Sequence, residues 1–281
     1  MTSPLGAAGE IAIRSLIERA PLASSLAAAY KSAGYKLALV GGPVRDAILG
    51  RLGNDLDFTT DALPLESKKI LKIWGENIWD TGIEFGTVAA KRGDTTVEVT
   101  TYRSDKYDPE SRKPEVEFGD NIAGDLSRRD FTVNCMALEL TTAVPEFIDP
   151  FNGLADLAKQ ILRTPVTPEQ SFSDDPLRMM RAARFASQLN FEIEESTLSA
   201  MKDMASRISI VSAERVRDEF TKMLMSSNPR RGISIMVDTG LAALVIPEIP
   251  KLKLEIDEHH HIFSFSELIQ RLNHTGCHPS F

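Results

Sequence analysis

Two aspartates separated by one residue, Asp55 and Asp57, have a spacing that could support catalysis. On a strand, residues i and i+2 point to the same side, so both carboxylates would face one way and Leu56 would face the core. Two adjacent negative charges repel unless a cation lies between them, and carboxylate oxygens suit Mg²⁺. The pair is therefore a candidate for holding two metal ions in a phosphoryl-transfer reaction, with a solvated turn as the alternative.

A glycine pair, Gly41 and Gly42, stands between an apolar run and a predicted helix. Glycine lets the backbone approach an anion closely, and the first turn of a helix offers unpaired N–H groups to it. Arg45 falls in that turn, where a cation opposes the helix dipole unless a polyphosphate fills the site. We therefore predict that Gly41, Gly42 and Arg45 bind phosphates, although an ordinary strand-to-helix turn would need the same glycines.

The run from Arg128 to Asn134 combines adjacent arginines, an acid and an amide ahead of an apolar stretch. Arg129 could bind phosphate, because guanidinium and phosphate form paired hydrogen bonds. Asp130 and Asn134 could bind ribose hydroxyls. A surface ion pair at the start of a strand is the alternative explanation.

An Asp–Arg pair, Asp175 and Arg178, lies at the start of a further predicted helix. If Ser173 or Asp174 caps this helix, the proline that follows falls in its first turn, where proline is tolerated. Asp175, Arg178 and Arg181 then share one helical face at spacings of three. A well-capped helix with ion pairs would leave the same pattern.

A carboxylate beside a guanidinium matches one class of nucleobase edge. Cytosine and adenine present an exocyclic amine beside a ring-nitrogen acceptor, whereas guanine and uracil present a carbonyl beside a ring N–H. Each good bidentate pair gives roughly 1–3 kcal/mol of discrimination. Asp175 and Arg178 could therefore select CTP and ATP without a nucleic-acid template.

The elements that must position these residues follow from hydrophobic periodicity and turn residues. Apolar runs predict strands at 36–40, 55–59, 87–91, 95–101, 133–140 and 144–148. Helical periodicity predicts helices at 8–33, from residue 43, and at 65–74, 174–189, 194–205, 212–226 and 228–239. The polar stretch 103–121, which contains two prolines, predicts a long mobile loop. Strand patterns end near residue 165, and an all-helical segment follows to about residue 250.

The composition is that of a globular protein: 281 residues, 42% of them hydrophobic and 26% charged. Two cysteines exclude a disulfide scaffold and fit a reducing cytoplasm, and no apolar run is long enough for a signal peptide or a membrane span. The net charge of −8, taken alone, argues against a nucleic-acid partner. Residues 201–231 nevertheless hold seven basic residues against four acidic ones, so the total conceals a local positive segment.

Together the motifs resemble the class II nucleotidyltransferases, which comprise CCA-adding enzymes and bacterial poly(A) polymerases. The resemblance rests on the order and spacing of residues 39–50, 55–60, 128–134, 149–157, 174–185 and 212–219. It implies an α+β fold: a nucleotidyltransferase head domain at 1–165, with a mixed sheet and flanking helices, and an all-helical neck and body at 166–250. Residues 251–281 would form an atypical tail, the start of a truncated histidine–aspartate domain.

The resemblance implies a role for each matched residue. Asp55 and Asp57 would be catalytic and would hold two Mg²⁺ ions. The nucleotide would be bound by the other matched residues: Gly41, Gly42, Arg45, Arg129, Asp130, Asn134, Asp175, Arg178 and Arg181. An RNA 3′-hydroxyl would then attack the α-phosphorus of CTP or ATP and release pyrophosphate, which adds CCA to the 3′ end of tRNA.

Several related functions would fit the same motifs: a CC-adding enzyme, an A-adding enzyme, a poly(A) polymerase, or a truncated remnant that binds RNA or nucleotides without activity. The expected partners are tRNA, CTP and ATP, with no membrane and no obligate protein partner. The resemblance also suggests that the loop at 103–121 takes part in the switch from C to A addition. All five histidines follow residue 258, and a solvated tail is preferred there over a metal site.

Overall fold

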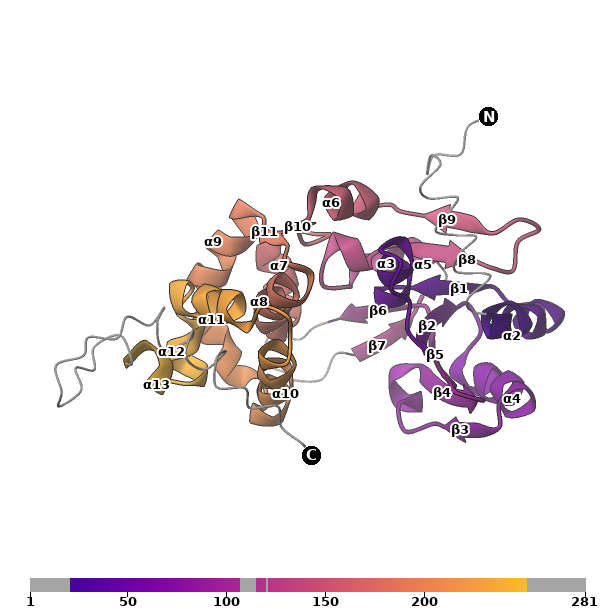
Figure 1. Ribbon diagram of the computed structural model, residues 1–281. Coiled ribbons are helices and arrows are strands. Elements are labelled where there is room, and N and C mark those ends of the chain that lie inside the picture. Colours follow the sequence, from indigo (N-terminus) through magenta and orange to yellow (C-terminus); the bar gives the residue numbers. More distant parts are fainter. Residues whose placement is uncertain (1–20, 107–114, 120, 252–281) are drawn as a thin grey trace. The chain divides into compact units, whose positions relative to one another are not determined.

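The computed structural model describes residues 21–106, 115–119 and 121–251 (Figure 1). The chain divides into two compact units, with the division after Thr167. Strands with flanking helices make up the first unit and helices nearly all of the second, which confirms the predicted α+β fold class. The tail at 252–281 and the first part of the predicted helix 8–33 lie outside the described residues. Within the described ranges, no helix is long and apolar enough to cross a membrane.

A seven-stranded sheet forms the centre of the first unit, in the order β3-β4-β5-β2-β1-β8-β9. β2 and β5 pair in parallel and the other neighbours pair antiparallel, so the sheet is mixed. Its strands are β1 (Leu37–Val40), β2 (Asp55–Thr60), β3 (Asn77–Trp79), β4 (Thr87–Arg92), β5 (Thr95–Thr101), β8 (Ala137–Glu139) and β9 (Glu146–Ile148). The sequence patterns miss β3, because three residues are too few for an alternation signal.

Burial along the two central strands explains their position. All four residues of β1 are buried, as expected for a strand covered on both faces. β2 begins with an exposed–buried–exposed alternation at Asp55, Leu56 and Asp57 and ends fully buried. The core therefore anchors the second half of β2 and leaves the two aspartates at its start exposed.

Helices flank the sheet of the first unit. They are α2 (Pro21–Ser32), α3 (Gly42–Ile48), α4 (Pro64–Trp74), α5 (Ile122–Ser127) and α6 (Gly153–Lys159). A side-chain hydrogen bond joins the two longest, since Trp74 Nε1 donates to Ser25 Oγ at 2.8 Å. The proline-marked start predicted for α3 agrees with the structure to within one residue.

The prediction of a loop throughout 103–121 is wrong. Two strands, β6 (Arg103–Lys106) and β7 (Glu115–Phe118), pair antiparallel, with Arg103 opposite Phe118. α5 then begins at Ile122, where the Asn121 side chain caps it by accepting from the Gly124 N–H. A two-stranded ribbon of this kind needs no apolar face for its backbone hydrogen bonds, so hydrophobic patterning gives no signal for it. Residues 107–114 and 120 lie outside the described part of the chain.

The predicted strand at 133–140 is also too long. Residues Thr132–Asn134 form a turn of 3₁₀ helix, and β8 begins at Ala137. Asp130 Oδ1 accepts from the Phe131 N–H at 2.8 Å and from Asn134 Nδ2 at 2.9 Å. These local hydrogen bonds compete with the strand ladder, which explains why a β-rich apolar sequence starts as a helical turn.

The second unit is built around α8 (Leu177–Leu189), which packs against both α10 (Ala213–Leu224) and α11 (Pro229–Asp238). Its other elements are α7 (Pro168–Asp174), α9 (Glu195–Met204), α12 (Leu241–Val245), α13 (Glu248–Lys251) and the two-residue strand β11 (Glu192–Ile193); β10 (Ile161–Leu162) closes the first unit. The helical predictions are confirmed here, apart from a break after Asp174 that separates α7 from α8.

Close packing in the second unit depends on a glycine. A Cβ built on Gly232 of α11 would lie 2.3 Å from Met223 Sδ and 2.4 Å from Ser187 Oγ. Neither α8 nor α10 could keep its place against any larger residue at this position. Gly232 therefore fixes how closely the three helices approach one another.

Candidate active site

Asp55 and Asp57 lie on the exposed side of β2, with Leu56 buried between them. No hydrogen bond or ion pair within the described residues engages the Asp55 carboxylate. Two such carboxylates, on one side of a strand whose far end is fixed in the core, are hard oxygen donors that fit a divalent cation. Among the described residues, no three His, Cys, Asp or Glu side chains form a group that could hold a metal ion.

Sequence reasoning missed a third acid near this pair. β2 pairs in parallel with β5, and Asp57 stands opposite Glu98 in the register. Glu98 is exposed between the buried residues Val97 and Val99, so it belongs to the exposed side of β5. The signal was present as an acid in an otherwise apolar and threonine-rich strand, but a parallel pairing between strands so far apart is not visible in the sequence.

The glycine turn predicted to bind phosphates follows β1 directly. Gly41 has φ of 75°, which favours glycine, and its N–H donates to the Met136 carbonyl at 3.2 Å. A Cβ on Gly41 would lie 2.9 Å from Arg129 Nη1. The absence of a side chain at Gly41 therefore lets the guanidinium of Arg129 approach the turn, which joins two of the predicted motifs.

Arg45, Asn134 and Asp130 form a buried hydrogen-bonded chain. Arg45 Nη1 donates to Asn134 Oδ1 at 2.6 Å, and Asn134 Nδ2 donates to Asp130 Oδ1 at 2.9 Å. The other side of the guanidinium is bidentate to Asp46, at 3.0 Å from Nε and 2.8 Å from Nη2. Because Asp130 and Asn134 are each 6% exposed, a surface ion pair does not describe this motif.

Arg129 lies against the glycine turn at Gly41 and makes fewer hydrogen bonds than Arg45. Its Nη2 donates to Asp125 Oδ2 at 3.1 Å, while its Nε is buried without a partner in the described part of the chain. Because Nε is buried, a ligand could not reach it, whereas Nη1 lies against the Gly41 turn. Nη1 is therefore the atom of Arg129 that could donate to an anion at this turn.

Residues 149–157 support the 3₁₀ turn at Thr132–Asn134, a role that residue types alone did not reveal. Asp149 caps α6 by accepting from the Gly153 and Leu154 N–H groups at 2.7 and 3.0 Å. Asp156, which is buried, accepts from Thr132 Oγ1 at 2.8 Å. A Cβ on Gly153 would lie 2.2 Å from the Thr132 carbonyl oxygen, so α6 sits directly against the 3₁₀ turn.

In the second unit, the predicted cap of the helix with the Asp–Arg pair is wrong. α8 begins at Leu177 and its N-cap residue is Pro176, so neither Ser173 nor Asp174 caps it. Asp175 Oδ1 accepts from the Leu177 N–H at 3.1 Å. Asp174 instead ends α7, because the two segments form separate helices rather than one.

The two arginines of this motif differ in burial. Arg178 is 5% exposed, and its Nη1 donates to Ser171 Oγ at 2.8 Å. Arg181 is half-buried, and its guanidinium lies 5.7 Å from the Phe185 ring centre, in the range of a cation–π contact. The first turn of α8 thus presents a half-buried acid, Asp175, beside a guanidinium with a fixed direction.

α10 supports this helix through two ion pairs that the sequence did not predict. Arg215 Nη2 donates to Asp175 Oδ2 at 2.9 Å. Arg184 Nε donates to Glu219 Oε2 at 2.5 Å, and both of these residues are buried. Each pair joins residues of two different helices that are far apart in the chain, so residue spacing within one helix could not predict it.

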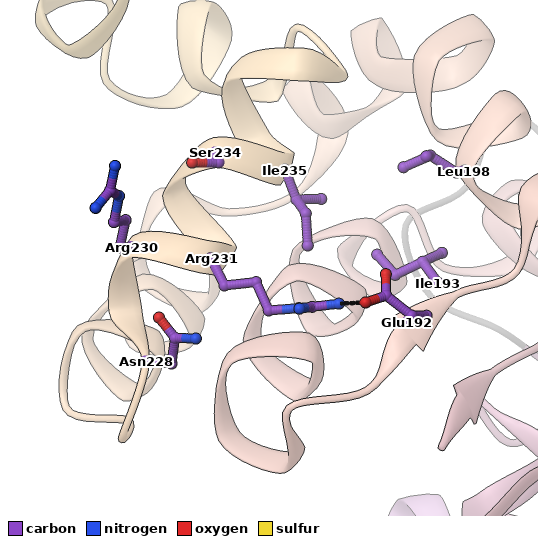
Figure 2. Close-up of a pocket in the computed structure, with 8 residues that line it drawn as sticks. All are labelled: Glu192, Ile193, Leu198, Asn228, Arg230, Arg231, Ser234 and Ile235. Atoms are coloured by element: carbon purple, nitrogen blue, oxygen red, sulfur yellow. Dashed lines mark ion pairs between the residues drawn. The ribbon is translucent and has the colours of Figure 1, made fainter. Parts of the chain in front are cut away.

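A cavity of about 410 Å³ lies between β11 and α11, lined by Glu192, Ile193, Leu198, Asn228, Arg230, Arg231, Ser234 and Ile235. Arg231 extends across it toward Glu192, to which it is ion-paired at 2.5 Å (Figure 2). Arg231 also donates to the Phe191 carbonyl at 3.0 Å. The cavity is thus crossed by a side chain that ties α11 to β11, and none of the predicted site residues lines it.

The chain matches two protein families over most of its described length. Residues 37–163 match the poly A polymerase head domain, and residues 190–252 match the probable RNA- and SrmB-binding site of polymerase A. The first match contains the predicted site residues of the first unit. Asp175, Arg178 and Arg181 lie in the segment between the two matches.

Relatives and solved structures agree with these families. A CCA-adding enzyme of Lactobacillus helveticus is 42% identical over 213 residues, which are 75% of this chain and 52% of the relative. The structure of the Bacillus stearothermophilus CCA-adding enzyme in complex with CTP superposes with a TM-score of 0.73 at 33% identity, covering 83% of this chain and 56% of that one. The Thermotoga maritima CCA-adding enzyme complexed with tRNA gives 0.69 at 28% identity, covering 84% and 55%.

The chain spans about half the length of the curated relatives it matches. The matched half contains the head domain and the RNA-binding region, in the same order as the two units of the structure. We conclude that the chain belongs to the nucleotidyltransferase family of the poly A polymerase head domain, the family of the CCA-adding enzymes.

Proposed function

We propose that the protein adds CCA to the 3′ ends of tRNA, using CTP and ATP and releasing pyrophosphate. The observation that carries the proposal is the exposed pair Asp55 and Asp57 on β2, in a domain that belongs to the nucleotidyltransferases. The CCA-adding relatives and the complexes with CTP and with tRNA support the choice of substrates. A cytoplasmic site of action is part of the proposal, consistent with a buried free thiol at Cys135.

Asp55 and Asp57 would hold the metal, and Mg²⁺ is the ion that suits their carboxylate oxygens. Glu98, exposed on the neighbouring strand, would be available as a further ligand. When bound, two such ions would activate the attacking hydroxyl and neutralise charge on the triphosphate. The strand itself contributes rigidity, because the core holds the buried half of β2.

The triphosphate and sugar would bind at the glycine turn. Arg129, whose Nη1 lies against the turn, would donate to phosphate oxygens beside Gly41. Asp130 and Asn134, linked to Arg45, would meet the ribose hydroxyls. Because Arg45 is already bound on both sides by Asp46 and Asn134, its main contribution would be to orient this pair.

The base would be selected by the second unit. Asp175 would accept from the exocyclic amine of cytosine or adenine, and Arg178 would donate to the ring nitrogen beside it. Asp175 Oδ1 accepts from the Leu177 N–H and Oδ2 accepts from Arg215, and a carboxylate oxygen can accept a second hydrogen bond. Arg181, half-buried on the same helix, would support the pair or contact phosphate.

The test is nucleotide incorporation into a tRNA that lacks CCA, with CTP and ATP supplied singly and together. Addition of two C and one A, in that order, supports the proposal. Long tails from ATP alone would instead identify a poly(A) polymerase, and arrest after CC would identify a CC-adding enzyme. No incorporation with either nucleotide would contradict the proposal and leave a nucleotide- or RNA-binding remnant.

A further inference from the structure

A buried carboxylate with no role in the proposed site, Asp125 of α5, lies beside Arg129. Asp125 is 0% exposed. Its Oδ2 accepts from Arg129 Nη2 at 3.1 Å, and its Oδ1 accepts from Arg128 Nε and Nη2 at 3.0 and 2.9 Å. Each oxygen of this one carboxylate therefore holds a different guanidinium.

Asp125 carries its negative charge at neutral pH. Burial alone would raise the pKa of Asp125, but the charges of Arg129 and Arg128 outweigh it and hold the pKa below its usual range. A buried charge is tolerated when it is paired and hydrogen-bonded on all sides, as here. The negative charge of Asp125 repels phosphate. Asp125 could therefore favour phosphate binding only by orienting the guanidinium of Arg129.

The orientation of Arg129 follows from this contact. A guanidinium is planar and rigid, so a hydrogen bond at Nη2 fixes the directions of the other two nitrogens. Nη1 lies 2.9 Å from the place where a Cβ on Gly41 would stand, and Nε is buried without a partner among the described residues. Nη1 is therefore the nitrogen of Arg129 that is turned to the glycine turn while Nη2 is held by Asp125.

We propose that Asp125 is a positioning residue that holds Arg129 against the Gly41 turn, so that Nη1 receives a phosphate of the nucleotide. The inference rests on the proposed function, because it concerns the same anion site. It adds a residue buried out of reach of the substrate, one that acts through Arg129 alone. Arg128 completes the pairing of Asp125 and lets the charge stay buried.

The variant that tests this is Asp125→Asn, which keeps the shape and removes the charge. The matched control is Asp80→Asn, an exposed acid of the same unit paired with Lys68 at 2.6 Å. Calorimetry with inorganic pyrophosphate should show about tenfold weaker binding for D125N, since a charge-assisted contact loses its geometry, and no change for D80N. In the incorporation assay, KM for CTP should rise about tenfold while kcat changes less than about twofold. Unchanged pyrophosphate binding in a folded D125N would overturn the inference.

A double-mutant cycle separates positioning from general structural damage. In an Arg129→Gln background, adding D125N should cause no further loss of pyrophosphate binding, because both changes disable the same contact. Full additivity of the two losses would contradict the inference. If D125N fails to fold, D125N/R128Q removes the buried acid together with one of its arginines, and the same weakening of pyrophosphate binding is expected.

Failure of this inference is distinguishable from failure of the proposed function. Pyrophosphate binding needs no turnover, so it reports on the Arg129 site even if the wild-type protein adds no nucleotide. A wild-type protein that incorporates CTP and ATP, with a D125N variant that binds pyrophosphate normally, would sustain the proposed function and refute the role of Asp125. A wild-type protein that binds no pyrophosphate would refute both the anion site and the positioning residue.

Discussion

The guanidinium of Arg215 on α10 donates to Asp175 at the start of α8 at 2.9 Å, across 40 residues of sequence. Asp175 also accepts from the Leu177 N–H at the start of α8, so its carboxylate is fixed from two directions. The carboxylate proposed to read the base is thus held by a helix that follows it by more than thirty residues. A carboxylate held in one position can meet the exocyclic amine of a base directly, whereas a mobile one would meet it only part of the time.

Replacing Arg215 with alanine should weaken base selection without unfolding the protein. Because Arg215 is more than half exposed, its ion pair contributes little to stability, about 0–1 kcal/mol. Without it Asp175 gains freedom, and the preference for CTP over UTP in single-nucleotide incorporation should fall severalfold. Arg217→Ala, which removes an exposed neighbour on the same helix, serves as the matched control. Equal selectivity in R215A and R217A would count against this support.

Asp55→Ala should reduce incorporation by about 1,000-fold or more, since a metal ligand supplies several kcal/mol of transition-state stabilisation. Asp55 is exposed on β2, so unfolding in urea should change by less than about 0.5 kcal/mol. Asp94→Ala, an exposed acid in the turn between β4 and β5, controls for loss of surface charge. Substantial activity in D55A would remove Asp55 from the catalytic site.

Arg178→Ala should lower the discrimination between CTP and UTP by about tenfold, the loss of one bidentate base contact. Because Arg178 is buried and bonded to Ser171, some stability will be lost as well. Ser171→Ala removes the same hydrogen bond but keeps the guanidinium, so it reports the stability effect by itself. An R178A variant with the same nucleotide preference as S171A would exclude base reading by Arg178.

Gly153→Ala should destabilise the first unit by about 1–3 kcal/mol or more, because its Cβ would lie 2.2 Å from the Thr132 carbonyl oxygen. The strain falls on the 3₁₀ turn that carries Asn134. Gly53→Ala is the control, since a Cβ there would meet nothing within 4 Å. Denaturant unfolding of both variants gives the comparison, and equal midpoints would show that α6 can shift away from the turn without cost.

The buried charge of Asp125 predicts a specific dependence of stability on pH. Its folded pKa is held below the ordinary value of 3.8, so the stabilisation is fully present only well above that value. It is lost as the pH falls from there through the folded pKa, because the folded state must then take up a proton against two guanidiniums. Urea unfolding at pH 7, 4 and 3 should show a loss in the wild type that D125N lacks. A parallel decline in both proteins would assign acid sensitivity to other carboxylates.

Local sequence patterns were enough to predict the main strands and helices and the types of chemistry. The continuous apolar run of β1, the alternation around Leu56 and the glycine pair after β1 are local signals, and each produced the expected element. Local patterns failed where a competing local interaction decided the outcome. Asp130 accepts from Phe131 and Asn134, and residues 132–134 form a turn instead of a strand; α8 starts at Leu177, whose N–H is bonded to Asp175, and not at Asp174.

Tertiary structure alone decided which of these residues act together. The parallel pairing of β2 with β5 puts Glu98 beside Asp57, and Gly41 matters because the guanidinium of Arg129 occupies the space of a side chain. Asp125 looks like an ordinary helix residue in the sequence, yet it is fully buried between two arginines. The physical reason is that a residue's type and spacing determine what it can bond to, while burial and long-range contacts determine which bonds remain for a substrate.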